Sequence, residues 1–422
     1  MNRRKFLLAS LLAPWGAHAQ ETFDEWKKDQ KQDFSQYKQR VREAFQRYKQ
    51  AHDKALKAYR AQIEDVWSTP ELTGRRKWAE YGPDRENQKV VDFDTQEIRI
   101  KVVDHGSGDI EEQLFRNLTD LLGEDFATAF QRNPVDQQVE KALKKDPGVV
   151  KQGKPGEDLV LGHLFDTPYP DGRVIEAKAR QLEEEGIRQK EEVNAGNGQA
   201  EVLSVPMEGG RSSPSNGDRK KSVKASSGRG WADRISVPVD EAEPMPNEAE
   251  PYLDAVRQQA AKHDLDPTLM LAVMHTESSF NPMARSHIPA YGLMQIVPES
   301  AGKDATRVLH GEPEVLPPSY LYEPQNNIEV GAVYLNLLYY HYVSDVQDVE
   351  SRLYCAIASY NTGSGNVAKT FVSSGSMSEA SKAINRRSSQ EVYQHLVSEL
   401  PYEEPRHYFQ RVTRRMLAYR NL

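Results

Sequence analysis

Cysteine is almost missing from this chain, because Cys355 is the only one among 422 residues. An internal disulfide is therefore excluded, and the single thiol, in the apolar stretch 353–357, is predicted to be buried. No cysteine precedes position 355, so the sequence lacks the cysteine of a bacterial lipoprotein box and we expect no lipid anchor. Histidine and cysteine do not cluster at metal-ligand spacing, so neither a metal ion nor another cofactor is predicted.

An excess of positive charge is also missing. Lys and Arg number 55 against 63 Asp and Glu, which gives a net charge of −8 and an isoelectric point near 5.9. Because nucleic-acid-binding domains are usually basic, this balance argues against nucleic acid as a partner.

Long apolar runs are confined to the start of the chain. Residues 6–16 are mostly apolar, follow the basic residues 3–5, and precede an Ala-His-Ala sequence at 17–19. This order is typical of a cleavable signal peptide over 1–19, with the mature chain beginning at Gln20. We therefore predict export to the periplasm, with a location free in that compartment or peripheral to the outer membrane or cell wall. The pair Arg3-Arg4 also resembles a twin-arginine export signal, so the export route stays open.

Residues 20–68 are highly charged but carry apolar residues at every eleventh position. One row consists of Phe23, Phe34, Phe45 and Leu56, and the neighbouring row consists of Trp26, Tyr37, Tyr48 and Tyr59. A period of eleven corresponds to 3.67 residues per turn, and no Pro or Gly interrupts 21–67, so one long helix is predicted. The stripe could contact another copy of the chain, another protein or the following domain, or the helix could be a solvated spacer.

A small α+β domain is predicted over 71–239. Residues 89–93 and 97–103 flank a turn at 94–96 and indicate a hairpin, and apolar spacing over 110–122 indicates an amphipathic helix. We expect a helix over 176–193, a returning strand over 231–239, and a disordered insert near 194–230, which is rich in Gly, Ser and Asn. An acidic, Pro-rich linker over 240–251 leads into the last domain, 252–422.

Glu277 ends a predicted helical segment that begins at Leu265 and has the apolar run 269–274 at its centre. Asp266 suits the N-cap, Pro267 suits the first helical position, and Pro282 ends the run, so a buried helix is predicted. A carboxyl group in the last turn of such a helix meets low polarity and the negative end of the helix dipole. Both effects raise its pKa, which is the property required of a general acid that breaks a glycosidic bond.

Four short motifs lie in order along this domain: ESSFNP from Glu277, GLMQ at 292–295, SYNTG at 359–363 and EPRHY at 404–408. Together they resemble the motifs of the lytic transglycosylases that have the soluble-transglycosylase, goose-lysozyme-like domain. The resemblance begins near Tyr252 and departs from the family at Thr362 and Pro405. It implies a mostly α-helical, lysozyme-like catalytic domain, so the chain as a whole is predicted to be α+β.

The resemblance also implies roles for individual residues. Glu277 would be the sole acid and base, and the residues that bind substrate would be Ser286, Met294, Gln295, Tyr360, Asn361 and Tyr408. Three of these positions keep a structural alternative. Met294 could simply pack in the core, Tyr360 could belong to cleft or core, and Ser286 could bond its own backbone in a turn.

The implied reaction is cleavage of the MurNAc–GlcNAc bond of peptidoglycan strands with formation of a 1,6-anhydroMurNAc end, as part of cell wall turnover and remodelling. One carboxylic acid suffices because the substrate supplies its own nucleophile, whereas most glycosidases need two carboxylates. A goose-type lysozyme, with Glu299 or Asp304 as the second acid, and a glycan-binding scaffold remain as alternatives. The order of long helix, small domain and catalytic domain is similar to the membrane-bound lytic murein transglycosylase C type, although the lipobox of that type is absent.

Overall fold

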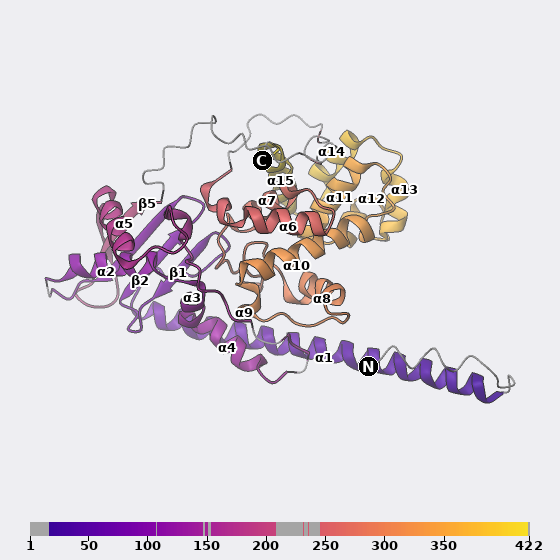
Figure 1. Ribbon diagram of the computed structural model, residues 1–422, viewed down its shortest axis with the longest axis horizontal. Helices are drawn as coiled ribbons and strands as arrows, with labels where there is room; N and C mark the ends of the chain where they lie inside the picture. The colour runs from indigo at the N-terminus through magenta and orange to yellow at the C-terminus, as the bar shows by residue number, and fades with distance from the viewer. Residues whose placement is uncertain are drawn as a thin grey trace.

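The computed structural model describes residues 17–106, 108–146, 148–150, 153–207, 231, 235 and 245–420, with the backbone alone for 17–38. Most of the predicted signal peptide, residues 1–16, lies outside this range. The α+β prediction is confirmed: a long helix, a five-stranded antiparallel sheet with its helices, and a helical domain follow one another along the chain (Figure 1). In the part of the chain so described, no helix combines the length and apolarity that crossing a bilayer requires.

Helix α1 (Ala17–Glu64) is the predicted long helix. It packs along α4 (Pro134–Leu143), and Phe45, Tyr48 and Tyr59 of the two aromatic rows are buried by other parts of the same chain. Of the possible contacts of the stripe, the structure therefore places its described half on the chain's own following unit. The side chains of the earlier members of both rows lie outside the described residues.

The sheet has the strand order β1-β2-β3-β5-β4, and neighbouring strands are antiparallel. Its strands are β1 (Lys77–Tyr81), β2 (Asn87–Asp92), β3 (Glu97–Val103), β4 (Ile187–Glu192) and β5 (Gln199–Pro206). The predicted hairpin is formed by β2 and β3, where Val91 pairs with Ile98. Alternate residues of β3, Ile98 and Ile100, face the main hydrophobic core, whereas Val103 joins a second cluster with Tyr59 of α1.

Helices α2 (Ile110–Leu122) and α5 (Gly172–Glu185) pack against the sheet and against each other. The predicted amphipathic helix is α2, whose leucines at 114, 118, 121 and 122 are buried. The short helices α3 (Phe126–Arg132), α4 and η2 (Gly162–Leu164) lie between them in the sequence. Of these, α4 and η2 contact the helical domain.

Three predictions for this unit are wrong in part. The expected helix over 176–193 ends at Glu185, and residues 187–192 form β4, because Gly186 lets the chain turn closely over Leu203 of β5. The expected insert near 194–230 contains β5, which completes the sheet instead of 231–239. Trp231 is not in a strand: its ring stacks on Tyr339 of the helical domain at 4.3 Å. Residues 208–230 and most of 232–239 lie outside the described range.

The helical domain begins with a 3₁₀ turn, η4 (Asn247–Tyr252), and ends with α15 (Glu403–Ala418). Between them lie α6 (Leu253–Lys262), α7 (Pro267–Ser278), η5 (Pro298–Gly302), α8 (Lys303–Leu309), α9 (Pro318–Leu321), α10 (Pro324–Leu337), η6 (Leu338–Tyr342), α11 (Val349–Thr362), α12 (Ser364–Phe371), α13 (Met377–Ile384) and α14 (Ser389–Glu399). Cys355 of α11 is buried as predicted, and burial raises the pKa of its thiol to about 12.

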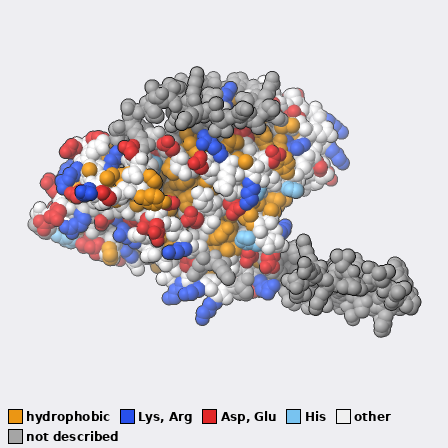
Figure 2. All heavy atoms as spheres, viewed as in Figure 1, with side chains coloured by type: hydrophobic (Ala, Val, Ile, Leu, Met, Phe, Trp, Pro, Cys, Tyr) orange, Lys and Arg blue, Asp and Glu red, His pale blue; other side chains and the backbone are white. Residues whose placement is uncertain are grey.

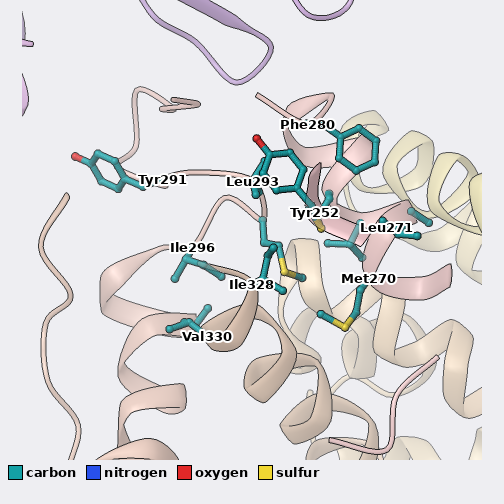
Figure 3. Packing of buried hydrophobic residues seen from close by; sticks show 14 of the residues in the cluster. Tyr252, Met270, Leu271, Phe280, Tyr291, Leu293, Ile296, Ile328 and Val330 are labelled. Atoms are coloured by element: carbon teal, nitrogen blue, oxygen red, sulfur yellow. The ribbon is translucent and has the colours of Figure 1, made fainter. Parts of the chain in front are cut away.

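The core of this domain lies between α7 and α10. Leu293 of the GLMQ motif and Ile296, which follows the motif, point into it beside Ile328 of α10 and Met270 of α7 (Figure 3). The motif loop is thus attached to the core by its apolar members, which positions its polar members at the edge of the core.

The sheet unit and the helical domain share a buried polar contact. Arg285 of the helical domain pairs with Asp136 of α4 at 3.1 Å, and the hydroxyl of Tyr322 donates to the same carboxylate at 2.9 Å. Asp136 and Arg285 are both almost fully buried, and Tyr48 of α1 packs edge-on against Tyr291 beside them. Because buried charges are costly unless paired, this contact ties the two units together. On the outer face, side chains of both charge signs are interspersed (Figure 2).

Candidate active site

Glu277 occupies the last turn of α7, as predicted. The Asp266 side chain caps the helix by accepting from the Thr268 amide at 2.8 Å, Pro267 is its first residue, and ten of its twelve residues are buried. Glu277 itself is only 5 % exposed. Burial raises the pKa of this carboxyl from 4.5 to about 7, against the opposing influence of nearby cations. The group can therefore hold a proton, and also release it, near neutral pH.

Charged and polar groups from three elements act on this carboxyl. After burial, the largest influence on the pKa of Glu277 is the charge of Arg75, which lowers it. On α15, Tyr408 and Arg411 also lower this pKa, whereas Glu404 raises it. On α11, Tyr360 lies close enough that Glu277, after burial, contributes to raising the pKa of its phenol. Glu277 is thus enclosed by α7, α11, α15 and the segment that precedes β1.

The backbone beside Glu277 is strained. Ser279 and Phe280 have φ angles of 51° and 61°, and Gln295 in the GLMQ motif has a φ of 47°. Residues with a side chain rarely adopt positive φ, and such strain concentrates at functional sites, where surrounding contacts enforce it. Here Ser278 supplies one such contact, since its hydroxyl donates to the Leu293 carbonyl at 2.8 Å and joins the two motifs.

Asn327 of α10 holds the GLMQ loop through the hydrogen bonds of its side chain. Its side-chain oxygen accepts from the Met294 amide at 2.8 Å, and its side-chain nitrogen donates to the carbonyls of Tyr291 and Leu321, both at 2.8 Å. Gly292 has a φ of 70° and lies so close to Asn327 that a side chain there would clash. The glycine of the motif is required by this approach and by its φ angle.

Gln295 projects from this loop with half of its amide engaged. Its nitrogen donates to the Gly292 carbonyl at 3.1 Å, whereas its buried oxygen has no hydrogen-bond partner among the described residues. A buried acceptor without a partner is rare and suggests that a ligand or water supplies the donor. This geometry agrees with the predicted role of Gln295 in substrate binding.

Met294 is fully buried and packs on Gly331 of α10, where a Cβ atom would overlap its sulfur. Its carbonyl accepts from the Tyr360 hydroxyl at 2.8 Å, and the Tyr360 ring packs on Tyr334 at 5.5 Å. For Met294 the structural alternative, core packing, describes its side chain. The Tyr360 ring is partly exposed while its hydroxyl is enclosed, so this residue lies at the border of cleft and core.

Ser286 donates its hydroxyl to the carbonyl of Ile288, two residues further along the chain. Its amide donates to the Ala290 carbonyl at 3.1 Å. The side chain therefore has the turn geometry that the sequence left open as the alternative to a contact with sugar. Partial exposure of Ser286 keeps it reachable from solvent.

Tyr408 of α15 neighbours Glu277, and Asn361 of α11 reaches the site through Glu404. The buried Tyr408 hydroxyl lowers the pKa of Glu277 as a hydrogen-bonding neighbour, but it makes no hydrogen bond of standard geometry within the described residues. Asn361 donates to the Glu404 carboxylate at 3.3 Å.

Of the acids considered for a hydrolase, Glu299 is exposed and Asp304 accepts from Tyr342 at 2.7 Å. Glu404 is the acid whose charge raises the pKa of Glu277.

Sequence reasoning missed three residues of this site. Glu404 was part of a recognised motif but received no role, and its position in that motif was a usable signal. Asn327 lies outside the four motifs and resembles any polar residue of an amphipathic helix. Arg75 lies about 200 positions before Glu277 in a different unit, so only the docking of the two units brings it to the site.

Residues 254–382, which include Glu277, Gln295 and Tyr360, match the family model described as the Transglycosylase SLT domain. This chain contains a transglycosylase SLT domain. The match ends before α14 and α15, so Glu404 and Tyr408 lie beyond the part of the SLT domain that the model covers.

Besides matching this domain model, the chain is similar to curated proteins named membrane-bound lytic murein transglycosylase C. The proteins of Salmonella arizonae and Klebsiella pneumoniae are each 42 % identical to it over 172 residues, which are 41 % of this chain and 47 % of theirs. The chain thus matches about half the length of these curated relatives. The similarity covers the part of this chain that holds the SLT domain. This chain and these curated proteins are distant homologues.

Solved structures with similarity to the chain include two lytic transglycosylases. The 70 kDa soluble lytic transglycosylase of Escherichia coli is 24 % identical with a TM-score of 0.31, covering 40 % of this chain and 24 % of that one. The lytic transglycosylase Slt of Pseudomonas aeruginosa is also 24 % identical with a TM-score of 0.31, covering 39 % and 23 %.

Proposed function

We propose that this protein is a peptidoglycan lytic transglycosylase that cleaves the MurNAc-β-1,4-GlcNAc bond and leaves a 1,6-anhydroMurNAc end. The observation that carries the proposal is Glu277, a buried carboxyl whose pKa is raised to about 7 at the end of α7. An acid with a pKa near the working pH can both donate and accept a proton in one cycle. The SLT domain and the similarity to lytic transglycosylases support the class of reaction.

In the proposed reaction, Glu277 first donates its proton to the oxygen that bridges the two sugars, and the bond from that oxygen to C1 of MurNAc breaks. The resulting carboxylate then takes the proton of the MurNAc C6 hydroxyl while that oxygen forms a new bond to C1. The proton lost in the first step is regained in the second, so Glu277 returns to its starting state. No water is consumed, and no metal or other cofactor takes part.

Two buried polar groups, on Gln295 and Tyr408, suit this sequence of steps. The Gln295 oxygen can accept from an amide N–H and the Tyr408 hydroxyl can donate to a carbonyl oxygen, so together they can hold the N-acetyl group of the reacting MurNAc. Held in this way, the N-acetyl oxygen can stabilise positive charge at C1 when the bridging bond breaks. Asn361 belongs to the same group of residues through its hydrogen bond to Glu404.

Mass spectrometry of muropeptides released from purified sacculi tests the proposal. The expected product is lighter than the hydrolytic product by the mass of one water. Digestion in water enriched in heavy oxygen adds an independent reading, because a hydrolase places solvent oxygen at the new end and a lytic transglycosylase does not. Labelled reducing ends would instead indicate a goose-type lysozyme, with Glu404 as a second acid. A wild-type chain that binds sacculi but releases nothing would indicate a glycan-binding scaffold.

A further inference from the structure

The segment between α1 and β1, residues 71–76, lies directly against the catalytic motif. The Gly74 carbonyl accepts from the Arg285 amide at 3.1 Å, and the Arg75 carbonyl accepts from the Asn281 side chain at 3.3 Å. Within its own unit, the Gly74 amide donates to the Lys77 carbonyl at 2.8 Å. The backbone on both sides of Arg75 is therefore fixed by hydrogen bonds to both units.

This fixed backbone directs two neighbouring arginines to different partners. Arg75 contacts the Glu404 carboxylate at 3.3 Å, and Asn361 donates to the same carboxylate oxygen from the other side. Arg76 contacts Asp94 in the turn between β2 and β3 at 3.1 Å, and Ser279 also donates to Asp94. The side chains of Arg75 and Glu404 remain about half exposed, so this pair lies at the open edge of the site.

We propose that Arg75, delivered from outside the SLT domain, is a positioning residue of the active site that acts on Glu277 through its charge and its contact with Glu404. This inference rests on the proposed function, since it concerns the same acid. It also gives the docked sheet unit a part in catalysis. The SLT domain contributes the acid, and the preceding unit contributes the cation that governs it.

The electrostatics of the site support this inference. Burial raises the pKa of Glu277, and the charge of Arg75 is the largest influence that lowers it. The other groups that face this carboxyl are Glu404, which raises its pKa, Tyr408 and Arg411, which lower it, and Tyr360 across the site on α11. Without Arg75, Glu277 would lose a cation and face an unpaired Glu404. Both changes raise its pKa.

The test compares pH profiles of kcat/KM for sacculus cleavage by the full chain and its variants. Activity needs protonated Glu277, so it should fall as pH rises through about 7. In Arg75→Met this alkaline limb should move up by about 0.5–1 pH unit, the low end of the range for an opposite charge because Arg75 is half exposed. Arg75→Lys keeps the charge and should restore the wild-type limb. Arg76→Met, the matched control on the same segment, should leave it near the wild-type position.

A limb that does not move in Arg75→Met, or moves equally in Arg76→Met, would overturn the inference. Product analysis of the wild type decides the proposed function separately, because a hydrolase that uses Glu277 as its acid would show the same limb. A reading independent of activity compares thermal unfolding of Arg75→Met with that of Arg75→Met carrying Glu277→Gln. The difference within each pair should grow from about pH 4.5 and level off near the folded pKa of Glu277, so it should level off at a higher pH in the Arg75→Met pair than in the wild-type pair. Levelling off at the same pH in both pairs would again reject the role of Arg75.

Discussion

Replacing Glu277 with glutamine should make the protein more stable above neutral pH while destroying its activity. The amide has nearly the shape of the protonated acid but can neither donate an acidic proton nor ionise. Loss of the general acid should reduce turnover by about 10²–10⁴-fold. The stability effect follows from the pKa of the same group and can be measured without substrate.

The sign and size of the stability effect come from proton linkage. The pKa of Glu277 is about 7 in the folded chain against 4.5 for the free group, so folding stabilises the protonated form. The stability that this group contributes is fully present below about pH 4.5 and is lost as pH rises through about 7. Moving a pKa from 4.5 to about 7 corresponds to about 3 kcal/mol in the free energy of unfolding, at about 1.4 kcal/mol for each pH unit.

The assay is thermal unfolding of the wild type and Glu277→Gln at several pH values from about 4.5 to about 8.5. The two melting temperatures should agree at the acidic end, and the variant should melt higher at the alkaline end. At about 2–4 °C for each kcal/mol, the difference should approach about 6–12 °C. Glu299→Gln, an exposed acid, serves as the control and should show no such trend. A difference between wild type and Glu277→Gln that stays constant with pH would refute the assignment of a raised pKa.

Three further changes test the surroundings of the site. Gly331→Ala places a Cβ atom against the Met294 sulfur, so it should cost about 1–3 kcal/mol in denaturant unfolding and lower turnover in sacculus digestion. A variant of full stability would contradict the packing of Met294. Asp136→Asn leaves Arg285 buried without its anion and should cost about 3–5 kcal/mol in denaturant unfolding. The control Asp254→Asn, which breaks an exposed pair, should cost below about 1 kcal/mol. Equal effects would contradict a buried pair. Phe45→Ser removes a buried ring of α1 and should cost about 1.5–3 kcal/mol and speed proteolysis of α1, while an unchanged digestion pattern would favour a solvated helix.

Periodic and capping signals predicted the local elements well. Asp266, Pro267 and the apolar run after them were enough to place α7 and to put Glu277 in its last turn. The hairpin of β2 and β3 and the helix α2 were equally readable. These signals succeed because caps, turns and amphipathic faces depend on residues a few positions apart.

The errors arose where a long-range contact decided the local structure. Residues 187–192 are mostly polar and charged and have little strand character. They form β4 because each of them pairs with a residue of β5. Composition over 194–230 indicated disorder, yet residues 199–206 within that range form β5 by pairing with β3.

By itself, the sequence placed Glu277 in the last turn of a buried helix and located the motifs around it, because each depends on neighbours within one helix or loop. Tertiary structure alone decided that Tyr48 of α1 packs on Tyr291 and that Arg75 stands beside Glu404. Those pairs join residues about 240 and 330 positions apart, and no local pattern encodes which surfaces will meet. They form because docking the sheet unit buries Arg285 with Asp136 and apolar rings with one another, and Arg75 is carried to the site by that docking.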